Sequence, residues 1–188
     1  MESKMKIIGI TGRARSGKDT LAGAILSLGE RGERMSFAAP IREFVSAITC
    51  IPLADIVDGP LKEQPLPEFG GRSARQMMQT LGTEWGRELI HRDLWITVAR
   101  KRLLSLSALP EADAPSVVVF SDVRFENEAT MIRELGGTVV HLHRVDATPV
   151  HGHASEAGID QHPEDLSVYN EGSIGDLLSA AAHIYAQA

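Results

Sequence analysis

The feature that most constrains this chain is a lysine-containing, glycine-framed loop between an apolar strand and a helix. Residues 6–11 form a short apolar run, which predicts a buried strand, and residues 18–29 predict a helix. The connecting loop and first helical turn are Gly12, Arg13, Ala14, Arg15, Ser16, Gly17, Lys18, Asp19 and Thr20. Glycines let backbone N–H groups converge, and a helix N-terminus adds its dipole and unpaired donors. We therefore expect this loop to bind an anion.

The spacing of Gly12, Gly17 and Lys18 between strand and helix is that of a P-loop, which holds the phosphates of ATP. Lys18 would bridge the β- and γ-phosphates, and a hydroxyl would reach Mg²⁺. Asp19 occupies the position where the usual pattern has Ser or Thr, so we expect Thr20 to supply that hydroxyl. Asp19 then either approaches Mg²⁺ through water or supports the helix N-terminus electrostatically. For Arg13 and Arg15 the alternatives are phosphate contact and solvated charge.

A second apolar strand, expected at residues 116–121, ends in Asp122-Val123-Arg124. A carboxylate at the end of a strand beside a P-loop is suited to hold Mg²⁺, and Arg124 would neutralise the transferring phosphate. The alternatives are a turn or helix cap for Asp122, and for Arg124 an ion pair with Glu126 or Glu128. Lys18, Asp122, Arg124 and Arg144 are the predicted catalytic residues, with Thr20 and Asp122 at the metal.

Strand and helix patterns alternate along the chain, which predicts an α/β fold with a parallel sheet covered on both faces. His141 and His143 would share one strand face, where a structural role is expected. Residues 52–71 hold four prolines and predict a loop. Further strands are expected at residues 34–37, 138–143 and 166–169 (the last at an edge), and helices at residues 41–49, 73–81 (capped by Ser73), 84–91, 94–106, 126–135 and 174–186.

Composition narrows the classes of function. The 188 residues suit one domain, and the net charge of −6 argues against binding of polymeric nucleic acid. Apolar runs fall short of the ~20 residues of a membrane span, and the first residues do not predict a signal peptide. Cys50 is the single cysteine and lies in an apolar run, so we expect an inert buried thiol and a cytoplasmic protein.

Taken together, the chain resembles the phage-type deoxynucleoside-monophosphate kinases. The similarity lies in RSGKDT at residues 15–20, RQMMQTLGTEWGR at 75–87 with HRDLW at 91–95, SDVRFENE at 121–128 with Gly136-Gly137, HASE at 153–156 and NEGS at 170–173. The resemblance implies a three-layer P-loop kinase fold with a five-stranded parallel sheet, a substrate-binding insertion and a lid. It also implies phosphate transfer from ATP to a deoxynucleoside monophosphate with Mg²⁺, and a homodimer.

The insertion is expected at about residues 38–95, between core segments 1–37 and 96–188. A monophosphate acceptor needs guanidinium contacts for its phosphate and an aromatic or amide group for its base. The candidates are Phe37, Arg42, Lys62, Arg75, Gln79, Thr83, Trp85, Arg87, Asp93 and Trp95. The alternatives are core packing for the two tryptophans, surface ion pairs for Arg75 and Arg87, and a helix cap for Asp93.

The polar stretch at residues 144–163 predicts a lid that excludes water, with Arg144 contacting phosphate or adenine. Two other classes of function fit the same P-loop. One is a small-molecule kinase of the dephospho-coenzyme A or phosphomevalonate type. The other is a nucleotide-dependent switch with a protein partner, which would turn over no acceptor.

Overall fold

The computed structural model describes residues 5–57, 59–144 and 158–188, and the chain divides into two compact units. Unit 1 comprises Met1–Ser36 and Val98–Ala188, and unit 2 comprises Phe37–Thr97. The helix α5 (Leu94–Ser107) begins in unit 2 and ends in unit 1. None of the helices in the described part of the chain has the length and apolar character that a membrane span requires.

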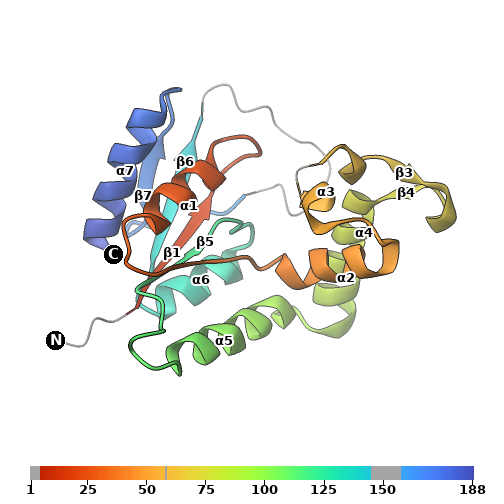
Figure 1. Cartoon of the computed structure of the whole chain (residues 1–188), viewed down its shortest axis with the longest axis horizontal. Helices are drawn as coiled ribbons and strands as arrows, with labels where there is room; N and C mark the ends of the chain where they lie inside the picture. The colour runs from red at the N-terminus through yellow and green to blue at the C-terminus, as the bar shows by residue number, and fades with distance from the viewer. Residues whose placement is uncertain (1–4, 58, 145–157) are drawn as a thin grey trace. The chain divides into compact units, whose positions relative to one another are not determined.

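Unit 1 is built on a five-stranded parallel sheet, as predicted (Figure 1). Its strands lie in the order β2-β5-β1-β6-β7. They are β1 (Lys6–Thr11), β2 (Gly32–Met35), β5 (Val117–Phe120), β6 (Thr138–His143) and β7 (Leu166–Tyr169). Ile8 of β1 pairs with Val119 on one side and with Thr138 on the other, so β1 is the central strand. Strand β7 is at the edge, as the sequence predicted.

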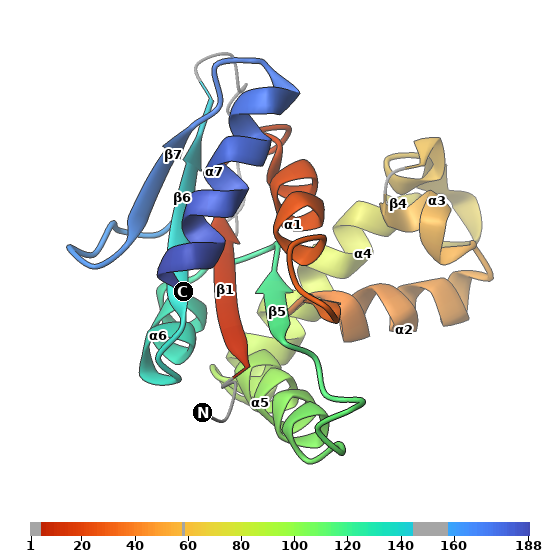
Figure 2. The same ribbon diagram turned by 60° about the vertical axis from the view of Figure 1, so that its left-hand side comes forward.

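Helices cover both faces of this sheet (Figures 1 and 2). Helices α1 (Lys18–Leu26) and α7 (Ile174–Gln187) pack on one face, and α6 (Glu126–Glu134) packs on the other. The fully buried side chains of Ile8, Leu21 and Ile184 join strand and helices in one core cluster. On the α6 face Gly9 leaves room for Ile132, whose Cδ1 would lie 2.4 Å from an added Cβ.

Unit 2 is mainly helical. It contains α2 (Ala39–Thr49), α3 (Leu53–Val57), α4 (Ala74–Thr80), the π-helix η3 (Leu81–Ile90), the 3-10 turns η1 (Pro60–Lys62) and η2 (Pro67–Phe69), and the strand pair β3 (Pro65–Leu66) and β4 (Arg72–Ser73). Ser73 caps α4, as predicted: its hydroxyl accepts from Gln76 N at 3.3 Å, and the Gln76 side chain accepts from Ser73 N at 2.9 Å. Val45, Ile56 and Ala74 form a buried cluster between α2, α3 and α4.

The expected loop at residues 52–71 is wrong, because this segment forms short helices and the strand β3. Two of its four prolines stand where helical turns begin, and Pro65 lies in β3. Pro60 and Pro67 each open a 3-10 turn. Proline suits such positions because its fixed φ is helical and its missing N–H would have no helical partner.

The helix predicted at residues 84–91 is present to Ile90 as part of η3, but it is not separate, because α4 continues directly into η3 at Leu81. Gly82 and Gly86, both in η3, are buried and serve the packing of Trp95. The Trp95 indole N–H donates to the Gly82 carbonyl at 2.7 Å. A Cβ on Gly86 would lie 2.7 Å from the indole ring, so glycine is needed for this contact.

Cys50 is exposed, which corrects the expected buried thiol. It directly follows α2 as the residue that caps the helix, with a left-handed backbone at φ 57°. The surrounding run is apolar in sequence, but a side chain beyond the last helical turn is no longer directed toward the buried face of the helix. An exposed thiol is open to solvent reagents.

Candidate active site

The loop after β1 has the backbone of an anion-binding cradle. Three of its residues have positive φ: Gly12 at 148°, Arg15 at 60° and Gly17 at 100°. A Cβ on Gly12 would lie 2.4 Å from the Leu142 carbonyl oxygen, so no other residue fits this position without a shift. The glycines predicted from the sequence are therefore required by both conformation and space.

Lys18 folds over this loop. Its Nζ donates to the carbonyls of Gly12 at 2.8 Å and Arg13 at 2.7 Å. Helix α1 starts here, with Leu21 N donating to Gly17 O at 2.9 Å, so its first N–H groups face the loop. The Ser16 hydroxyl is buried and has no partner among the described residues. The ammonium group, the helix N-terminus and this spare hydroxyl fit a phosphate chain.

The loops that follow β1 and β5 leave toward opposite faces of the sheet, because α1 and α6 lie on opposite faces (Figure 2). In open α/β sheets, ligands bind at the carboxyl edge where two neighbouring connections diverge in this way. The two strand ends are tied together by Val123 N, which donates to Ile10 O at 3.2 Å. Asp122 thus lies at the same edge as the phosphate loop, as its position in the sequence predicted.

Asp122 is buried and accepts a hydrogen bond of 2.5 Å from the Ser36 hydroxyl. Ser36 directly follows β2 and was missed by sequence reasoning, although the carboxyl-edge rule applied to it as well. The expected strand at residues 34–37 ends at Met35, which leaves Ser36 outside the ladder. The Asp122 carboxylate and the exposed Thr20 hydroxyl on the first turn of α1 are hard oxygen donors, and such donors fit Mg²⁺.

Asp19 has a partner that neither alternative from the sequence included. Its carboxylate pairs with Arg34 of β2 at 3.1 Å, and a second Arg34 nitrogen donates to the Asp19 carbonyl at 2.9 Å. Both side chains are substantially exposed, at 76% for Asp19 and 41% for Arg34. This ion pair links the start of α1 to β2. A water-mediated approach of Asp19 to Mg²⁺ is a separate matter and stays a prediction.

The turn that carries Arg124 is held by Glu128. The buried Glu128 carboxylate accepts from the backbone N–H of Arg124 at 2.8 Å and of Phe125 at 3.1 Å. Glu128 therefore binds the Arg124 backbone in this turn, and the role of the guanidinium stays a prediction.

Arg144 directly follows β6 and donates to the Arg15 carbonyl of the phosphate loop at 3.4 Å. Most of the predicted lid, residues 145–157, lies outside the described residues, and so do His153, Ser155 and Glu156.

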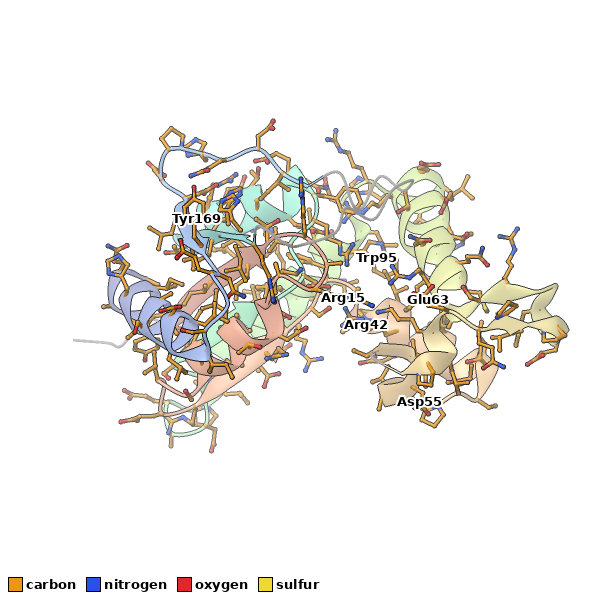
Figure 3. All side chains as sticks on the ribbon, turned by 90° about the horizontal axis from the view of Figure 1, so that it is seen from above. Arg15, Arg42, Asp55, Glu63, Trp95 and Tyr169 are labelled. Carbon is orange, nitrogen blue, oxygen red and sulfur yellow. The ribbon has the colours of Figure 1, made fainter. Side chains whose placement is uncertain are left out.

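The predicted acceptor residues lie in unit 2, with environments of three kinds. Trp95 (labelled in Figure 3) and Phe37 are buried, whereas Trp85 exposes 43% of its surface. Arg75 forms an ion pair with Glu63, the surface alternative that the sequence left open. Lys62, Arg42, Gln79, Thr83, Arg87 and Asp93 are half-buried; Lys62 Nζ donates to Val57 O at 2.7 Å, and Arg87 to Arg92 O at 3.4 Å. Their roles in substrate binding stay predictions.

Away from the loop, a buried ionic cluster joins α6, β6 and the segment before β7. Asp165 accepts from Arg133 through two bonds, at 2.9 and 2.7 Å, and lies 2.9 Å from His141 Nε2. Burial acts to raise the pKa of Asp165, but the bonds from Arg133, the His162 N–H and His141 hold it below its ordinary value. His141 thus has the structural role that the sequence predicted, and His143 stacks on Tyr169 (labelled in Figure 3).

The fold is similar to that of a solved kinase structure. A gluconokinase from Sinorhizobium meliloti 1021 superposes with a TM-score of 0.52 at 17% identity, over 97% of this chain and 92% of that one. At this identity the likeness shows the fold alone. The sheet, the phosphate loop and the carboxylate after β5 place the chain in the P-loop kinase fold class.

The family model described as deoxynucleotide monophosphate kinase matches residues 69–181. A protein of Acanthamoeba polyphaga mimivirus with that family name is 30% identical over 172 residues, which are 87% of this chain and 82% of that protein. The deoxynucleoside-5'-monophosphate kinase of Escherichia phage T5 is 33% identical over 94 residues. That match covers 46% of this chain and only 35% of the phage protein. The chain belongs to the deoxynucleotide monophosphate kinase family.

Proposed function

We propose that the chain transfers the terminal phosphate of ATP to a deoxynucleoside monophosphate, giving ADP and a deoxynucleoside diphosphate. The observation that carries this proposal is the pairing of the Gly12–Lys18 cradle with the buried Asp122 at one sheet edge, in a member of this family. The proposal extends to this chain an activity that the phage T5 relative has by name.

The reaction needs positioning and charge stabilisation more than covalent catalysis. An oxygen of the acceptor monophosphate attacks the terminal phosphorus of ATP, and the bond from that phosphorus to the bridging oxygen breaks. The acceptor oxygen is already ionised and the leaving ADP keeps the electron pair, so the step needs no general base. Lys18, Arg124 and Arg144 would offset the charge of the transferring phosphate.

Asp122 and Thr20 would hold Mg²⁺, which supplies charge neutralisation for the phosphate chain when bound. Ser36 fixes one oxygen of Asp122, so the carboxylate is presented in one orientation. In unit 2, Arg42, Arg75 and Arg87 are the candidates for the acceptor phosphate. The exposed Trp85 is the aromatic candidate for the base.

The test is an ADP-release assay with purified protein, ATP and Mg²⁺ across a panel of acceptors. The panel contains the four deoxynucleoside monophosphates, their ribonucleotide counterparts, dephospho-coenzyme A and phosphomevalonate. We expect turnover with one or more deoxynucleoside monophosphates well above the acceptor-free rate. Turnover confined to the last two acceptors would replace the proposal with another small-molecule kinase. ADP release that no acceptor stimulates would favour a nucleotide-dependent switch.

A further inference from the structure

Asn170, at the carboxyl end of β7, contacts the phosphate loop 154 residues earlier in the chain. Its Nδ2 donates to the Ser16 carbonyl at 2.8 Å. The residue is 6% exposed, so this bond is shielded from water. Asn170 begins the NEGS stretch, to which the sequence assigned no chemical role.

Two side-chain bonds fix the orientation of the Asn170 amide: the bond from Nδ2 to Ser16 and a second in which Oδ1 accepts from Gly172 N at 3.1 Å. The backbone of Asn170 is held as well, because its N–H donates to the His143 carbonyl at 2.8 Å. Reversing the amide would set two donors against each other at Gly172 and two acceptors against each other at Ser16. The environment therefore requires the donating NH₂ group to face the phosphate loop.

The loop is shaped to receive this side chain. A Cβ on Gly17 would lie 2.8 Å from Asn170 Nδ2 and 3.4 Å from the Leu177 side chain, so only glycine lets the amide approach. Gly17 also has a φ of 100°, which other residues rarely adopt. Glycine at position 17 thus meets two requirements: it leaves space for the Asn170 amide, and it adopts the positive φ of the loop.

Holding the Ser16 carbonyl also sets the direction of the next N–H group. In a trans peptide the carbonyl and the following N–H point in opposite directions, and the described part of the chain has no cis peptide. The bond from Asn170 therefore directs the Gly17 N–H away from Asn170. This N–H belongs to the cradle to which the proposed function assigns the phosphates of ATP.

We propose that Asn170 is a positioning residue that keeps the phosphate loop in its ATP-binding conformation by holding the Ser16 carbonyl. The inference rests on the proposed function, because it assumes that the loop binds ATP. Asn170 is far from the phosphate loop in sequence and acts through its bond to that loop. It has no assigned contact with the acceptor.

The test compares Asn170→Asp and Asn170→Ala with Gln187→Glu by isothermal titration calorimetry with ATP and, separately, with the accepted deoxynucleoside monophosphate. Gln187 is exposed at the end of α7 and is not among the residues assigned to the site, so its conversion to an acid repeats the chemical change on the surface. An unpaired buried carbonyl should weaken ATP binding about tenfold in Asn170→Ala, and the acceptor–acceptor contact should weaken it further in Asn170→Asp. Binding of the monophosphate should change less than about twofold, because that site is assigned to unit 2.

Thermal unfolding establishes which variants are folded. If Asn170→Asp does not fold, Asn170→Ala decides by the same comparison, since it adds no charge. ATP binding by a folded Asn170 variant equal to that of Gln187→Glu would overturn the role of Asn170 and leave the proposed function intact. Equal weakening of ATP and monophosphate binding would overturn it in favour of general structural loss. A wild-type protein that fails to bind ATP would overturn the proposed function itself.

Discussion

Replacing Asp165 by asparagine should destabilise unit 1 strongly. The Asp165 side chain is only 1% exposed, and its Oδ2 accepts from Arg133, His141 and the His162 backbone within 2.7 to 2.9 Å. Asparagine keeps one acceptor oxygen, and its NH₂ group would face the N–H donors that now bind the carboxylate. It also leaves the Arg133 guanidinium, whose side chain is 16% exposed, with the Glu126 carboxylate as its ionic partner among the described residues.

Breaking a buried ion pair by removing one partner costs about 3–5 kcal/mol, and the retained Glu126 bond places this case near 3 kcal/mol. For a chain of this length that corresponds to a fall of roughly 6–12 °C in the melting temperature. Thermal unfolding followed by circular dichroism measures the difference. The matched control is Glu134→Gln, which breaks an exposed pair with Arg100 and should cost about 0.5 kcal/mol or less.

The same variant should change the dependence of stability on pH. The pKa of Asp165 is held below its ordinary value of 3.8, so its contribution is complete above that value and is lost as the pH falls through the folded-state pKa. The stability difference between wild type and Asp165→Asn should therefore shrink as the solution is acidified below about pH 4. Equal melting temperatures for Asp165→Asn and Glu134→Gln at pH 7 would refute the reasoning.

Three further predictions concern the site. Lys18→Ala should lower kcat by at least ~100-fold, since it removes a preorganised charge; near-normal turnover of the folded variant would contradict this. Gly12→Ala should abolish ATP binding in calorimetry, because its Cβ would lie 2.4 Å from the Leu142 carbonyl; retained affinity would show that the loop can shift. Ser36→Ala should weaken Mn²⁺ binding to the protein–ATP complex, read by electron paramagnetic resonance, because Asp122 loses the bond that orients it; unchanged Mn²⁺ affinity would remove Ser36 from the site.

The elements of unit 1 were predictable because each carries a strong local signal. Strand β6 has the predicted bounds, and α6 and α7 end within one residue of them. Unit 2 was harder, because its prolines and glycines act through tertiary contacts. Gly86 reads as a helix breaker until Trp95 is seen against it, and Pro60 and Pro67 open turns too short for periodicity to detect.

The candidate site likewise contains residues that the sequence marks locally and residues that it does not. Gly12, Lys18 and Asp122 were predictable because the strand–loop–helix spacing and the end of an apolar strand mark them directly. Ser36 bonds Asp122 from 86 positions away, and Asn170 bonds Ser16 of the phosphate loop from 154 positions away. Such distances in sequence leave no local pattern. Arg34 pairs with Asp19 for a similar reason, since strand order, and not sequence, brings β2 to α1.

The most direct test of the proposed phosphate transfer follows the terminal phosphate itself. The protein is incubated with Mg²⁺, ATP labelled at the γ-phosphorus and each deoxynucleoside monophosphate, and the products are separated by chromatography. We predict that the label appears in the β-phosphate of a deoxynucleoside diphosphate and that Lys18→Ala prevents this. Label that stays in ATP, or appears only as inorganic phosphate with every acceptor, would contradict it.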